Sequence, residues 1–115
     1  MSFNRYFKRS EFACKCGCGF DTVDYDLVKV LTVVREHFAS PVTINSASRC
    51  ESHNESVGGA KGSQHRLGRA ADITVKGVLP IDVYNFINGH APYSLGVGSY
   101  NSFTHIDTRL TKARW

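Results

Sequence analysis

Two short segments of the chain carry residue types that bind a catalytic metal ion. In the first, His65 on a polar loop precedes Asp72 in a strand-like run. In the second, His105 and Asp107 lie two residues apart and so project from one face of a predicted strand. Two imidazoles and one carboxylate, with water in the fourth position, make a catalytic zinc site. From spacing alone, ion pairs between the aspartates and neighbouring arginines explain the pattern almost equally well.

Asp72 gives a physical reason to expect a functional role for the first segment. It falls in the middle of a predicted strand over 69–75, in which every second residue from Ala71 is apolar. A carboxylate in so short an apolar strand is costly to bury unless it is paired or binds a metal. We therefore expect this segment to supply half of a site.

The elements that must position these residues follow from the hydrophobic pattern. Apolar residues recur at helical spacing in two segments, one capped by Asp24 and ending near Phe38, the other over 80–87. The pattern predicts strands in four segments: 42–45, 69–75, 94–100 and 103–108. A polar loop over 46–67, rich in serine and glycine, joins the first two strands, and such a loop in a small domain is typical of a functional segment.

Length and composition indicate one globular domain. The chain has 115 residues, of which 42% are hydrophobic and 21% charged, and we expect residues 1–115 to form a single domain with an irregular arm at 1–20. No apolar run reaches the ~18 residues of a membrane-spanning helix, and the first residues lack the apolar stretch of a secretion signal. We therefore expect synthesis in the cytoplasm without a signal peptide, and no membrane insertion.

The net charge of +4 favours acidic partners. Nucleic acid and anionic cell-wall polymer meet this condition equally well on charge alone. The basic residues are scattered, however, and the chain carries no nucleic-acid recognition motif, so we expect no nucleic-acid partner.

The four cysteines are a separate feature. Cys14, Cys16 and Cys18 alternate within five residues, and Cys50 lies far along the chain. This spacing differs from the usual zinc knuckle, and a cytoplasmic origin argues against an obligatory disulfide framework. The sequence leaves three states open: a structural metal, free or partly buried thiols, or one bridge from Cys50 to the other three.

The string Ser-x-His-x2-Gly-x-Ala-x-Asp over 63–72 resembles the signature of the D-Ala-D-Ala carboxypeptidase-like zinc peptidases, which share a fold with the hedgehog signalling domain. The segment 103–109 resembles their second motif, and the closing Ala-Arg-Trp resembles the compact murein-peptidase branch. The resemblance extends from about Phe12 to the C-terminus. It implies an α+β fold, in which a small antiparallel sheet carries helices packed on one side.

The resemblance also assigns roles to individual residues. It implies that His65, Asp72 and His105 bind one Zn²⁺ per chain. Arg49 resembles the arginine that anchors a substrate carboxylate or carbonyl in the family, a task that suits the guanidinium fork. The alternative interpretation of Arg49 is a surface ion pair.

One departure from the family pattern concerns the general base. Many relatives place an acidic residue three positions before the last histidine ligand, where this chain has Ser102. Asp107 is the only acid beside the second motif, and we expect it to act as the base or to orient the metal-bound water. A second register, in which Asp107 binds zinc and His105 transfers the proton, stays open. Imidazole is the better zinc donor, which favours His105 as the ligand.

Two residues of the polar loop complete the expected site. We expect Ser63 to bond the substrate backbone or to orient His65. We expect His53 to line the cleft or contact the substrate, and a structural role for His53 fits the sequence equally well.

Taken together, the resemblance implies a zinc-dependent peptidase that hydrolyses peptidoglycan peptide bonds. It would be a carboxypeptidase or endopeptidase of D,D or L,D type, and a phage endolysin is one form of such an enzyme. We expect a monomer that acts on peptidoglycan stem peptides, either after release to the cell wall or as part of a phage particle. The alternative is a non-catalytic, zinc-stabilised domain for cell-wall binding or interaction, which the serine in place of the usual acid keeps open.

Overall fold

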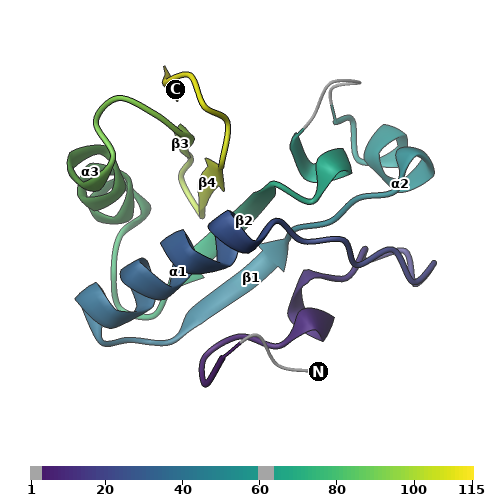
Figure 1. Cartoon of the computed structure of the whole chain (residues 1–115), viewed down its shortest axis with the longest axis horizontal. Coiled ribbons are helices and arrows are strands. Elements are labelled where there is room, and N and C mark those ends of the chain that lie inside the picture. The colour runs from purple at the N-terminus through teal and green to yellow at the C-terminus, as the bar shows by residue number, and fades with distance from the viewer. Residues whose placement is uncertain (1–3, 60–63) are drawn as a thin grey trace.

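A computed structural model describes residues 4–59 and 64–115 (Figure 1). In chain order its elements are η1 (Arg9–Phe12), α1 (Tyr25–Phe38), β1 (Val42–Ser46), α2 (Glu51–Ser56), η2 (Gln64–Leu67), β2 (Ala70–Val75), α3 (Pro80–His90), β3 (Gly96–Ser99), β4 (Thr104–Asp107) and β5 (Ala113–Arg114), where η marks a 3₁₀ helix. The strands form one sheet in the order β1-β2-β4-β3-β5. No helix among the described residues is long and apolar enough to cross a membrane.

Strand β2 brings together the two segments of the predicted metal site. It pairs antiparallel with β1 on one side and with β4 on the other, and the register sets Asp72 opposite His105. Residues directly opposite in an antiparallel pair project to the same face of the sheet. Ala70 lies opposite Asp107 on that same face, where its small side chain leaves room beside the carboxylates.

The opposite face of the sheet carries the hydrophobic core. Ile73 of β2 and Ile106 of β4 are fully buried there, under α1 and α3 (Figure 1). Helix α1 presents a stripe of Leu27, Leu31 and Val34 to this core, because apolar residues three and four apart share one side of a helix. The sheet therefore has an apolar face, which packs in the hydrophobic core, and a polar face, on which the candidate site lies.

Helix α1 begins as the sequence predicts. The side chain of Asp24 accepts a hydrogen bond from the backbone N–H of Asp26, which satisfies one of the donors left open at a helix start. Ala39 ends the helix in a left-handed conformation, and Pro41 follows. The cap and the apolar stripe together determine both the limits and the orientation of α1.

The α+β prediction is confirmed, with three differences in detail. Strand β5 pairs in parallel with β3, so the sheet is mixed rather than purely antiparallel. The polar segment 46–67 contains the short helices α2 and η2 instead of loop alone. Helix α3 continues to His90, three residues beyond the predicted end. Ring stacking between His90 and Phe86 accompanies this last turn.

Replacing Leu31 by alanine tests the packing of α1 against the sheet. Leu31 is 0% exposed, so Leu31→Ala leaves a cavity and should lower the free energy of unfolding by about 2–5 kcal/mol. Leu110→Ala makes the same change at a side chain that is 92% exposed, and should cost less than about 0.5 kcal/mol. Urea unfolding followed by circular dichroism measures both variants. Equal losses would contradict the place of α1 in the core.

Candidate metal centre

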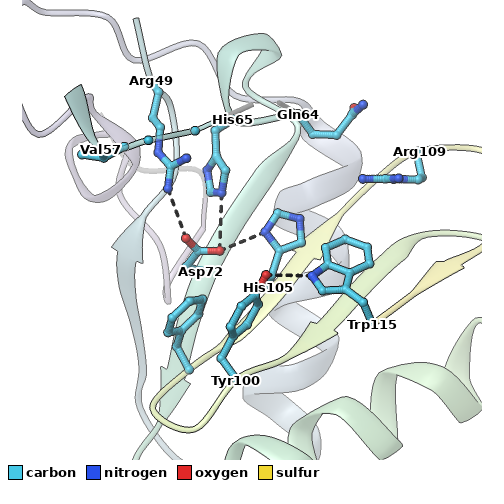
Figure 2. Close-up of a pocket in the computed structure, with 12 residues that line it drawn as sticks. Arg49, Val57, Gln64, His65, Asp72, Tyr100, His105, Arg109 and Trp115 are labelled. Atoms are coloured by element: carbon cyan, nitrogen blue, oxygen red, sulfur yellow. Dashed lines mark hydrogen bonds and ion pairs between the residues drawn. The ribbon is translucent and has the colours of Figure 1, made fainter. Parts of the chain in front are cut away.

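Three side chains from separate elements converge on the polar face of the sheet (Figure 2). His65 comes from η2, Asp72 from β2 and His105 from β4. Both histidines contact the same oxygen, Oδ1 of Asp72. Nε2 of His65 lies 3.4 Å from it and Nδ1 of His105 lies 2.9 Å from it. One donor atom from each residue lies within 4.8 Å of the other two. The structure thus brings together the three residues that the sequence singled out.

The backbone of the polar segment orients His65. Its Nδ1 lies 2.7 Å from the carbonyl oxygen of Ala47, an acceptor, so Nδ1 carries the proton and Nε2 is the nitrogen with a lone pair to offer. The carbonyl oxygen of His65 accepts a hydrogen bond of 3.0 Å from the backbone N–H of Arg49. His65 is only 3% exposed, and both contacts tie it to the segment that follows β1.

Asp107 holds His105 from the side away from Asp72. Its Oδ2 lies 2.8 Å from Nε2 of His105. The guanidinium of Arg109 donates to both oxygens of Asp107, at 2.7 and 2.8 Å, and the backbone N–H of Gly96 donates at 3.1 Å. Asp107 is fully buried. A carboxylate on the outer nitrogen of a metal-binding histidine fixes the tautomer and the orientation of the ring.

The two aspartates have different partners. This difference bears on whether each of them belongs to a metal site or to an ion pair. Asp107 pairs with Arg109, as the ion-pair alternative expects. Asp72 faces the two histidines, and its second oxygen lies 3.4 Å from Nη2 of Arg49. Each aspartate therefore pairs with an arginine, and Asp72 differs from Asp107 in facing both histidines.

The protonation behaviour of the cluster follows from these contacts. Burial alone would raise the pKa of Asp72, but the hydrogen bond with His105 and the nearby imidazole of His65 outweigh it and hold the pKa well below its ordinary value. Burial would also raise the pKa of Asp107, but the contacts with His105 and Arg109 outweigh it and lower the pKa below its ordinary value. For His105, burial lowers the pKa, and the contacts with Asp107 and Asp72 raise it above its usual range. Both carboxyls are therefore ionised at neutral pH, as metal binding requires of Asp72.

The donor set fits a zinc ion. Two imidazole nitrogens and one carboxylate oxygen are the ligand types of catalytic zinc sites, which keep a further position open. The three donors border an open pocket of about 550 Å³, so a fourth position would face solvent and substrate. A positive ion among these donors would also balance the charge of Asp72.

Aromatic side chains form one wall of this pocket. The indole N–H of Trp115 donates a hydrogen bond of 2.8 Å to the hydroxyl of Tyr100, whose ring stacks on Phe103 with centroids 4.4 Å apart. The indole also lies beside the His105 ring, at 5.1 Å between centroids. A side chain at Gly98 would collide with the indole, so only glycine lets the ring lie against the sheet. The sequence gives no signal that Tyr100 or Phe103 belongs to the site, because aromatic residues near a strand end are equally typical of a hydrophobic core.

The remaining predicted residues divide into three groups. Arg49 lines the pocket, held by Ser46, Asn54 and Asp72. His53 lies on α2 and is not among the described residues that line the pocket, so a substrate contact remains a prediction. Ser63 lies outside the described residues. Gln64 and Arg109 line the pocket although the sequence analysis gave them no substrate role.

Comparison with known proteins agrees with this geometry. The family described as Peptidase M15 matches residues 5–107 of the chain, a span that contains all three converging residues. No curated protein sequence matches the chain significantly. The match covers most of the chain and every element from η1 to β4. The chain therefore belongs to the peptidase M15 family, the D-Ala-D-Ala carboxypeptidase-like zinc peptidases.

Proposed function

We propose that this protein is a zinc-dependent peptidase that hydrolyses peptide bonds in peptidoglycan. The observation that carries the proposal is the convergence of His65, Asp72 and His105 at the edge of an open pocket. Membership of the peptidase M15 family supports the same class of activity. The finer proposal is an enzyme of D,D or L,D specificity that works as a monomer on the cell wall, as a phage endolysin does.

In this proposal His65 Nε2, His105 Nδ1 and Asp72 Oδ1 hold one zinc ion. When bound, zinc supplies Lewis acidity toward water and toward a peptide carbonyl. Asp107 keeps the imidazole of His105 turned so that Nδ1 faces the other donors, since it binds Nε2 on the opposite edge of the ring. Ala47 does the same for His65 through Nδ1.

The walls of the pocket suit a peptide that carries carboxylates. Arg49 and Arg109 place two guanidinium groups on its lining, which favours the carboxyl and carbonyl oxygens of stem peptides. Oε1 of Gln64 is buried and has no hydrogen-bond partner within the described part of the chain. A buried oxygen without a donor is costly, and a turn of the carboxamide toward the pocket would let a substrate N–H satisfy it. We therefore assign the positioning of the peptide to Arg49, Gln64 and Arg109.

The position of Asp107 favours an orienting role over that of general base. Both of its oxygens already accept hydrogen bonds from Arg109, and the side chain is fully buried away from the pocket lining. Among the described residues that line the pocket, Asp72 is the only carboxylate. The pocket lining thus offers no carboxylate besides the predicted ligand to act as general base. This observation favours one second candidate, a non-catalytic zinc-stabilised domain that binds cell-wall peptides.

Digestion of purified peptidoglycan separates the two candidates. The enzyme should release peptide fragments or amino acids, which mass spectrometry identifies together with the bond cleaved. A chelator should abolish release, and added zinc should restore it. His65→Ala should behave like the chelated enzyme, whereas His90→Ala, the same change at an exposed histidine outside the pocket, should retain full activity. A chain that keeps its zinc and binds peptidoglycan without releasing product would establish the binding domain instead.

Asp107→Asn tests the orienting role. The amide keeps the shape but removes the charge that pairs with Arg109 and His105, so zinc affinity should fall about 10- to 100-fold. Competition with a chromophoric chelator measures this affinity. Asp82→Asn, at an exposed carboxylate in the first turn of α3, serves as the matched control and should leave affinity unchanged. Full zinc affinity with loss of turnover would identify Asp107 as the general base.

Arg49→Lys tests substrate anchoring. Lysine keeps the charge but loses the fork that reaches Ser46, Asn54 and Asp72 together. We expect kcat/KM for a peptidoglycan fragment to fall about 10- to 100-fold, because this is the effect of losing one charge-assisted hydrogen bond. The zinc content should stay unchanged. Steady-state kinetics and metal analysis of the same sample measure both quantities. Unchanged kinetics would reduce Arg49 to a structural ion pair.

A further inference from the structure

A second cluster of metal-binding side chains lies apart from the pocket. The thiols of Cys14, Cys16, Cys18 and Cys50 lie within 4.8 Å of one another. Three sulfur–sulfur distances are 3.4 Å for Cys14–Cys16, 3.7 Å for Cys14–Cys50 and 3.6 Å for Cys16–Cys50. The cluster joins the N-terminal arm to the residue that precedes α2.

These distances match one of the three states that the sequence leaves open. A disulfide brings two sulfurs to about 2.05 Å and leaves no reason for the other two to gather. Zinc binds four thiolates tetrahedrally at about 2.3 Å, which places the sulfurs about 3.8 Å apart. The observed separations of 3.4–3.7 Å lie close to that tetrahedral edge. All four cysteines take part, as a four-thiolate site requires.

The backbone around the cluster is shaped to present the sulfurs inward. Gly17 has φ +82°, a conformation that favours glycine, and its N–H donates to the carbonyl oxygen of Cys14. This tight turn lets alternating cysteines converge, although their spacing differs from a zinc knuckle. The backbone N–H groups of Cys50 and His53 point at the sulfurs of Cys14 and Cys50, at 3.5 and 3.4 Å. Such donors stabilise negative charge on sulfur.

We propose that Cys14, Cys16, Cys18 and Cys50 bind a second zinc ion as four thiolates, in a structural site separate from the catalytic centre. A closed four-sulfur site has no open position for water and therefore serves stability rather than hydrolysis. The donor types make the two sites chemically distinct: sulfur alone in one, nitrogen and oxygen in the other.

The location of this site gives it a defined consequence. It would close a long loop between the arm and the segment after β1, and thereby stabilise the folded chain. Cys50 adjoins Arg49, whose backbone N–H binds the carbonyl oxygen of His65. The neighbouring Ser48 N–H binds the carbonyl oxygen of Phe12 in the arm. The second ion would therefore hold the segment that positions both Arg49 and His65.

Cobalt substitution tests the proposal without reference to activity. The chain is purified under reducing conditions, stripped of metal and titrated with Co²⁺ and, separately, with Zn²⁺. Four thiolates should give an intense sulfur-to-cobalt charge-transfer band, which nitrogen and oxygen ligands do not produce. Metal analysis of the zinc-loaded chain should find two equivalents. The thiols should react with an aromatic disulfide reagent only after zinc is removed.

Two matched variants assign each ion to its cluster. Cys18 is exposed, so Cys18→Ser leaves the core intact; with three thiolates left, the charge-transfer band should weaken and the affinity for one zinc equivalent should fall. His65→Ala should lose the other equivalent and keep the band, which separates failure of this site from failure of the catalytic one. Absence of the band in the wild-type chain would overturn the proposal. So would an intact mass that lacks two hydrogens, since it would identify a disulfide in place of the metal.

Discussion

The pairing of β2 with β4 is the constraint on which the site depends. The antiparallel register sets Asp72 against His105, two residues that lie far apart in the sequence, and sets Ala71 against Ile106 on the core face. A slip of one residue would turn the carboxylate into the core and the isoleucine toward the pocket. Because the same alternation buries the isoleucines on one face and turns Asp72 and His105 to the other, the hydrophobic core itself enforces the approach of these two side chains.

Asp107 and Arg109 form a second layer behind the donors. A buried carboxylate is stable only when charges and hydrogen bonds compensate it, and the fork of Arg109, the Gly96 N–H and His105 do so together. This compensation makes Asp107 a rigid support for the imidazole. The same contacts engage both oxygens of Asp107. They are the structural basis on which we propose that Asp107 orients His105 rather than transferring a proton.

Much of the fold could be predicted from the sequence because its signals are local. The apolar stripe and the Asp24 cap predicted α1, and strict alternation predicted β2 and β4. The short α2 and η2 were missed, since a polar segment of a few residues carries no hydrophobic period. The parallel pairing of β5 was missed as well, because two residues give no pattern from which to read direction.

The sequence pointed to residues of the pocket where a side chain was unusual for its element, and gave no signal where the side chain was ordinary. Asp72 stood out as a charge in an apolar strand, and the structure places it among two histidines. Two partners of Asp107, His105 and Arg109, are its neighbours two residues away, whereas its contact with the Gly96 N–H depends on the register of β3 against β4, which sequence periodicity does not determine. Tyr100 and Gln64 gave no such signal, since each lines the pocket only because of the path that the folded chain takes around it.

The close approach of Trp115 to Gly98 ties the aromatic wall of the pocket to the strand that pairs with β4. The indole rests where any larger residue at position 98 would place its first carbon, so this one position determines how far the aromatic wall stands from the metal donors. Gly98 also pairs with His105 between β3 and β4, and the indole lies 5.1 Å from the His105 ring, so a larger residue there would disturb the aromatic wall and the imidazole together. The size of residue 98 therefore limits both the shape of the pocket mouth and the position of one predicted zinc ligand.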